Sequence, residues 1–113
     1  MPKSSKLFIS TAIPYPNAEP HLGFGLEITQ ADVLARYYRE KGDKDVFFLT
    51  GTDENSLKNV LAAEKSGLAT REFVDRISPK FRRLKDILNL SFDDFIRTTE
   101  KRHVDGVEKL WEA

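Results

Sequence analysis

The stretch IPYPNAEPHLGF, residues 13–24, decides how the first part of this chain folds. It follows a short apolar run, LFIST at 7–11, and precedes a segment with helical periodicity at 25–41. Its three prolines lack backbone donors and restrict the residues before them, which keeps the stretch out of a helix. We therefore expect a strand, a loop and a helix in that order. The loop delivers His21 to the helix N-terminus, where free N–H groups favour an anion.

A second apolar run, DVFFLT at 45–50, is bounded by Gly51 and is typical of a strand buried on both faces. The run at 7–11 is likewise interpreted as a buried strand. Two such strands joined by a helix of about this length form a parallel βαβ unit with a right-handed crossover. The fold class predicted from these runs is α/β.

Three further helices are expected after the second strand. The first covers roughly 55–66. The second starts at Thr70 and extends to Leu88, but Pro79 should kink or split it; the third begins near Thr99 as N-cap. One face of the first should carry Leu57, Val60 and Leu61. The last helix leaves Leu110 and Trp111 without a partner, and two strands make a poor sheet. We therefore expect residues 1–113 to be one N-terminal fragment of a longer protein, with no complete second domain.

Composition narrows the possible functions. The 113 residues include 40% hydrophobic side chains, enough for one modest folded domain. Eighteen acidic residues balance eighteen basic ones, so charge gives no sign of a nucleic-acid or membrane surface. There is no cysteine and only two histidines, so no metal site is expected here. The apolar runs are too short for a membrane span or a secretory signal, and a cytoplasmic protein is expected.

Two loops should meet at the carboxyl edge of the parallel strands, which is where α/β sheets bind ligands. One contains His21 and the other reads GTDEN at 51–55, so His21 and Asp53 could share a pocket. Simpler interpretations stay open at this point. Asp53 or Asn55 could cap the following helix, and Tyr15 could pack on the sheet edge. A basic cluster is most simply a solvated helix face; it comprises Lys80, Arg82, Arg83 and Lys85.

Several strings together resemble the methionyl-tRNA synthetases, a family of class I aminoacyl-tRNA synthetases. IPYPNAEPHLGF is similar to their PYxNxxxHLGH signature, and it is followed in family order by VFFLTGTDEN and by LSFDDFIRTTEKRH at 90–103. The resemblance extends from Lys6 almost to the end of the chain. It implies an incomplete Rossmann-like (HUP-type) nucleotide-binding fold, and a full-length methionine–tRNA ligase that uses ATP with Mg²⁺, methionine and tRNA(Met). The 113 residues alone are expected to be inactive, and the oligomeric state is unknown.

The resemblance also implies roles for individual residues. His21 would be catalytic. The ATP would be held by Asn17, His21, Gly23 and Phe24, and methionine by Ile13, Tyr15 and Asp53. Asp53 would accept hydrogen bonds from the substrate ammonium group. Zinc could be bound only by a downstream part, because no metal ligands are assigned here.

Two residues depart from the family pattern. Phe24 stands where the family has its second histidine, and Asn55 stands where a histidine follows GTDE. Phe24 cannot donate a hydrogen bond to a phosphate, so a slower enzyme is expected. The alternative is a catalytically impaired paralogue that binds an adenylate or amino acid as a regulatory module. A small stand-alone nucleotidyltransferase is a third interpretation. The chain contains no KMSKS-like string.

Overall fold

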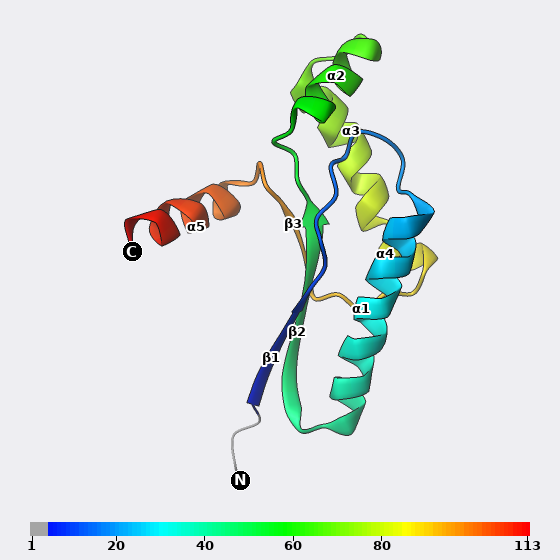
Figure 1. Ribbon diagram of the computed structural model, residues 1–113, viewed down its shortest axis with the longest axis vertical. Helices are drawn as coiled ribbons and strands as arrows, with labels where there is room; N and C mark the ends of the chain where they lie inside the picture. The colour runs from blue at the N-terminus through cyan, green and yellow to red at the C-terminus, as the bar shows by residue number, and fades with distance from the viewer. Residues whose placement is uncertain (1–4) are drawn as a thin grey trace.

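The structure, a computed structural model, describes residues 5–113. Residues 1–4 lie outside this range, and they belong to the N-terminal segment in which no secretory signal is expected. The elements follow one another as β1 (Ser5–Ser10), α1 (Leu22–Lys41), β2 (Lys44–Thr52), α2 (Leu57–Lys65), α3 (Thr70–Arg82), α4 (Leu84–Ile87), β3 (Asp94–Arg97) and α5 (Lys101–Glu112). Figure 1 shows their arrangement. Within the described range, no helix is long and apolar enough to cross a membrane.

The three strands form one parallel sheet in the order β1-β2-β3. The predicted βαβ unit is confirmed, with Phe8 of β1 opposite Phe47 of β2. The third strand was not predicted. It places Phe95 opposite Thr50, and its entry is fixed where the Asp93 N–H donates to the Phe48 carbonyl at 2.8 Å.

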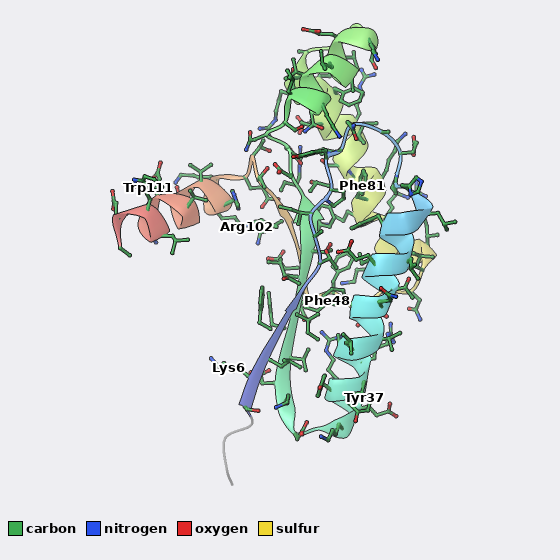
Figure 2. The ribbon with its side chains drawn as sticks, in the orientation of Figure 1. Lys6, Tyr37, Phe48, Phe81, Arg102 and Trp111 are labelled. Carbon is green, nitrogen blue, oxygen red and sulfur yellow. The ribbon has the colours of Figure 1, made fainter. Side chains whose placement is uncertain are left out.

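Within residues 5–113, α1 and α3 pack on one face of this sheet, and β1 and the first half of β2 are exposed on the other. Phe48 is fully buried between the sheet and the helices (Figure 2). Phe8 is 61% and Phe47 45% exposed, and their rings stack on each other. The interpretation of 7–11 as a buried strand is therefore wrong for β1, and burial on both faces is wrong for the first half of β2. The main core cluster comprises Ile28, Ala31, Ala35, Phe48, Phe81, Leu90, Phe92 and Phe95.

The helix predicted over 55–66 forms, but it packs through a different face. Leu57 is 71% and Leu61 48% exposed, whereas Asn59 and Ala63 are fully buried. The N-cap is Ser56, whose hydroxyl accepts the Lys58 N–H at 3.1 Å. The apolar-face prediction is thus wrong, and so is the interpretation of Asp53 or Asn55 as the helix cap.

The last two predicted helices also differ in detail. The helix that starts at Thr70 is split, as expected, but the break lies at Arg83: α3 includes Pro79 and continues to Arg82, and α4 begins at Leu84. Thr99 does not cap α5, because its hydroxyl donates to Glu54; the N-cap is Glu100, without a side-chain hydrogen bond. No residue of α5 is buried, and this helix projects away from the sheet with Trp111 near its tip.

Gly51→Ala should destabilise the protein strongly, because a Cβ at this position would lie 2.0 Å from the backbone oxygen of Ile96 on β3. The two strands would have to separate, and we expect a loss of about 2 kcal/mol. Urea unfolding followed by far-UV circular dichroism measures it. Gly106→Ala on α5 is the control, since nothing among residues 5–113 lies within 4 Å of its Cβ. Equal unfolding midpoints for the Gly51 variant and the parent would contradict this account.

Candidate active site

The two loops predicted to share an edge of the sheet are joined directly. The Asp53 N–H after β2 donates to the Pro14 carbonyl after β1 at 2.9 Å. Just after β1, the hydroxyl of Thr11 lies 2.7 Å from the hydroxyl of Thr50 on β2. The first loop is also tied to α1, because Glu27 accepts the Ala12 N–H at 2.7 Å. The parallel strands therefore bring both loops to one edge, as expected.

His21 is the N-cap of α1. Its Nδ1 accepts the Gly23 N–H at 2.9 Å, which explains why α1 begins at Leu22 and not near Gly25 as predicted. Because Nδ1 accepts a hydrogen bond here, the donor of the imidazole is Nε2, which has no acceptor among residues 5–113. A Cβ at Gly23 would lie 3.1 Å from that Nδ1, so glycine leaves room for the capping imidazole.

A cavity of about 410 Å³ opens beside this helix start. It is lined by Pro14, Tyr15, Asn17, Ala18, Glu19, His21, Phe24, Lys58 and Phe81. Four residues predicted for the site are therefore brought together from the first loop and the first turn of α1. Ile13, Gly23 and Asp53 are not among its lining residues; Asp53 lies in the β2–α2 loop, which the Pro14 hydrogen bond holds against the first loop.

Phe24 belongs to both the cavity and the core. Its ring meets Phe81 edge to face, with centroids 5.7 Å apart and planes at 62°. It also packs against the main hydrophobic cluster. The residue that departs from the family pattern thus has an apolar environment that suits phenylalanine.

Lys58 is a cavity residue that the sequence interpretation missed. Its Nζ lies 5.9 Å from the centroid of the Tyr15 ring, within reach of a cation–π contact. Lys58 and His21 thus line one hollow near the N-terminus of α1, an arrangement that favours an anionic ligand. The only sequence signal was its place just after the GTDEN loop.

A second hollow of about 440 Å³ lies next to the first and shares Glu19 with it. Lys80 of the basic cluster lines it and is ion-paired with Glu19. Arg82 and Arg83 are exposed, as expected of a solvated helix face, but the ammonium group of Lys85 donates to the Phe92 carbonyl at 2.7 Å and lies 4.8 Å from the Phe92 ring centroid. Residues 5–113 contain no group of three or more side chains suited to hold a metal ion.

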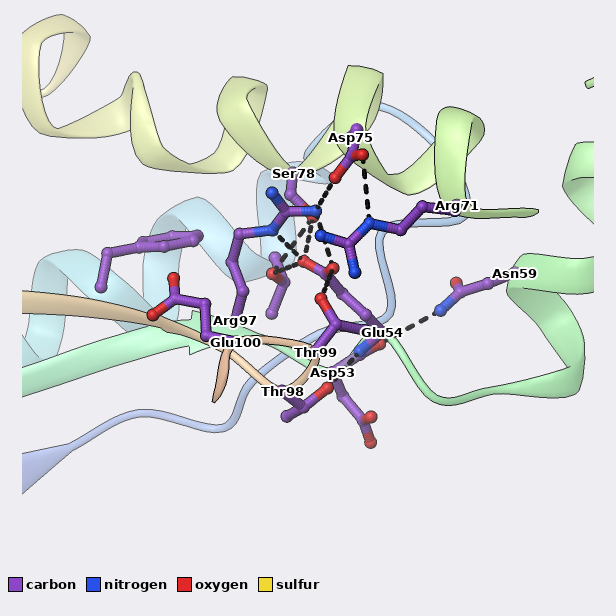
Figure 3. A network of polar contacts seen from close by, with 12 residues as sticks. Asp53, Glu54, Asn59, Arg71, Asp75, Ser78, Arg97, Thr98, Thr99 and Glu100 are labelled. Carbon is purple, nitrogen blue, oxygen red and sulfur yellow. Dashed lines mark hydrogen bonds and ion pairs between the residues drawn. The ribbon is translucent and has the colours of Figure 1, made fainter. Parts of the chain in front are cut away.

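Behind Asp53 lies a buried ion pair (Figure 3). The Glu54 side chain is fully buried, and Arg97 donates to it through Nε at 2.6 Å and Nη2 at 2.8 Å. Ser78 and Thr99 donate to the same carboxylate at 2.6 and 2.7 Å. Burial acts to raise the pKa of Glu54, but these hydrogen bonds prevail and hold the pKa below its usual range. Sequence periodicity gives no hint of this pairing.

Residues 7–113 match the family described as tRNA synthetases class I (M). The chain belongs to this family. The methionine–tRNA ligase of Brucella suis is 46% identical over 108 residues, and that of Mycobacterium leprae is 46% identical over 104. These alignments cover 96% and 92% of this chain, but only 21% and 19% of the relatives.

The fold of the chain is also similar to that of a solved structure from this family. The Mycobacterium tuberculosis methionyl-tRNA synthetase in complex with methionyl-adenylate superposes with a TM-score of 0.91 at 44% identity. The match covers 96% of this chain and 21% of that one. The chain therefore has the α/β, Rossmann-like fold of that catalytic domain and spans about a fifth of its relatives' length.

Proposed function

We propose that this chain forms the N-terminal part of the catalytic domain of a methionine–tRNA ligase. The observation that carries the proposal is His21, which caps α1 through Nδ1 and so leaves an Nε2–H donor beside a cavity lined by Lys58. Such a pairing of helix N-terminus, imidazole and ammonium suits the phosphates of ATP. The similarity to methionine–tRNA ligases supports the same activity.

In the proposed reaction the methionine carboxylate attacks the α-phosphorus of ATP. A new O–P bond forms, the bond to the β-phosphate oxygen breaks, and pyrophosphate leaves with Mg²⁺. A hydroxyl at the 3′ end of tRNA(Met) then attacks the activated carbonyl and releases AMP. The residues form no covalent bond to the substrate, so they act by positioning and by stabilising charge in the transition state.

We assign one group of residues to ATP and another to methionine. His21 is the catalytic donor to the phosphates, with Asn17 and the Gly23 backbone beside it, and Phe24 forms an apolar wall of the ATP site. Ile13 and Tyr15 offer apolar surface to the methionine side chain, for which a flexible thioether is suited. The Asp53 carboxylate receives the methionine ammonium group.

The proposal also implies a cellular location, a macromolecular substrate and a place for any zinc. We place the protein in the cytoplasm, with tRNA as its macromolecular substrate. Any zinc would be held by a region outside residues 1–113, since the described part contains no suitable ligand group. The decisive experiment is methionine-dependent ATP–pyrophosphate exchange by the full-length protein. Absence of exchange with every amino acid would overturn the proposal.

Phe24→His should raise the exchange rate by about ten- to hundredfold, because it adds a donor at the phosphates. It should also lower stability by about 1 kcal/mol, since the ring leaves its contact with Phe81. Steady-state exchange kinetics and urea unfolding measure the two effects. Phe24→Leu, which adds no donor, is the control. The regulatory alternative predicts ligand binding without turnover, even after Phe24→His is combined with Asn55→His.

A further inference from the structure

Both peptide groups that flank Asp53 are held from outside the β2–α2 loop. In the first, the Thr52 carbonyl accepts the Thr98 N–H at 3.2 Å, and the Asp53 N–H donates to Pro14 at 2.9 Å. In the second, the Asp53 carbonyl accepts Nδ2 of Asn59 at 3.2 Å, and the Glu54 N–H donates to the Thr98 hydroxyl at 2.7 Å. All four backbone groups are therefore satisfied, which fixes the φ and ψ of Asp53.

Thr98 makes two of these four contacts and is itself held firmly. It is 6% exposed, and it follows Arg97, whose guanidinium is paired with the buried Glu54 carboxylate. Thr99, the next residue, donates to the same carboxylate. Figure 3 shows Thr98 directly beneath the backbone of the Asp53–Glu54 loop. The turn after β3 is thus pinned on both sides of Thr98.

The buried amide of Asn59 costs folding free energy, which points to a role in positioning its one partner. The residue is fully buried, and its Oδ1 has no hydrogen-bond partner within residues 5–113. A buried amide that satisfies only one end loses the hydration of the other. The contact it does make is with the Asp53 carbonyl.

We infer that Thr98 and Asn59 are positioning residues that hold the Asp53 carboxylate at the methionine ammonium group. The inference rests on the proposed function. Asp53 has only its Oδ1 engaged, by the Asn55 N–H at 3.2 Å, within the described part of the chain. A rotation of either peptide group that flanks Asp53 would move its carboxylate away from the position where we expect the substrate ammonium group.

The test uses methionine and ATP kinetics of the full-length protein. Thr98→Val keeps the shape but removes the acceptor, and we expect a roughly tenfold higher KM for methionine with an unchanged KM for ATP. Thr98→Ser keeps the hydroxyl and should stay within about twofold of wild type. The desamino analogue of methionine lacks the ammonium group, so Thr98→Val should leave its inhibition constant unchanged.

Two further variants separate positioning from general stability. Asn59→Leu removes the amide contact together with the unpartnered oxygen, so it should fold well and still raise the KM for methionine. Ser78→Ala loses the hydroxyl contacts to the side chains of Glu54 and Thr52 without touching either peptide group beside Asp53, and should lower stability alone. An equal KM rise in Ser78→Ala, or equal weakening of the desamino analogue, would overturn the inference. Wild-type protein without exchange would overturn the proposed function instead.

Discussion

His21→Ala in the full-length protein should lower methionine-dependent ATP–pyrophosphate exchange by about 10²–10³-fold, because it removes a donor from the developing charge on the phosphates. The loss should appear mainly in kcat, with a smaller change in the KM for ATP. The effect is expected to be large because Phe24 supplies no second donor in this chain. Exchange kinetics over a range of ATP concentrations separate the two parameters.

The same substitution removes the N-cap of α1, so a control for folding is needed. Losing a capping side chain costs about 1 kcal/mol. His21→Asn keeps a side-chain oxygen able to accept the Gly23 N–H, but it lacks the Nε2 donor. We expect His21→Asn to restore the unfolding midpoint while leaving exchange as low as in His21→Ala. Wild-type rates in His21→Asn would show that His21 acts only as a cap.

The sequence predicted those parts of the fold that depend on neighbouring residues. The βαβ unit follows from two apolar runs and the helix between them, and parallel strands bring their loops to one edge. The strand β3 escaped prediction because Asp94–Arg97 is short and begins with an acidic residue. It forms because it pairs with β2, some 45 residues earlier in the chain.

Burial and polar pairing were the less predictable features of the site. An apolar run does not reveal which face of a strand the helices cover, and Phe8 and Phe47 lie on the uncovered one. The fully buried amide of Asn59 contradicts the apolar periodicity of α2. Glu54 and Arg97 lie 43 positions apart, so no local spacing could relate them. Lys58 meets Tyr15 only because the two loops converge.

These unpredicted contacts explain how a loop edge can hold a substrate group in place. Most cavity residues come from the β1–α1 loop and the start of α1, with Lys58 from α2 and Phe81 from α3, whereas Asp53 comes from the β2–α2 loop. Rigid placement of Asp53 therefore depends on the turn after β3, which carries Thr98. That turn is held by the Glu54–Arg97 pair, so the stability of this pair and the geometry of the site are linked.

Arg97→Met should be the most destabilising of the substitutions considered, at about 3 kcal/mol at neutral pH. It leaves the fully buried Glu54 carboxylate without its cation, although Ser78 and Thr99 still donate to it. Urea unfolding followed by far-UV circular dichroism measures the loss; Trp111 is 89% exposed and would report poorly. Arg76→Met is the control, because its surface pair with Glu72, which Arg97 does not contact, should contribute less than about 1 kcal/mol.

The dependence of this loss on pH distinguishes a buried charge from lost packing. The pKa of Glu54 is lowered in the folded protein, so the stabilisation from Arg97 is present above the unfolded value of about 4.3 and disappears as the pH falls through the folded one. In Arg97→Met, burial instead favours protonation of Glu54, which relieves the unpaired charge. The difference in unfolding free energy between parent and variant should therefore be largest near pH 7 and shrink below about pH 4.3. A difference that stays constant with pH would mean that Arg97 acts through its aliphatic packing, because the two carboxylates that it pairs with, Glu54 and Asp75, both titrate in this range.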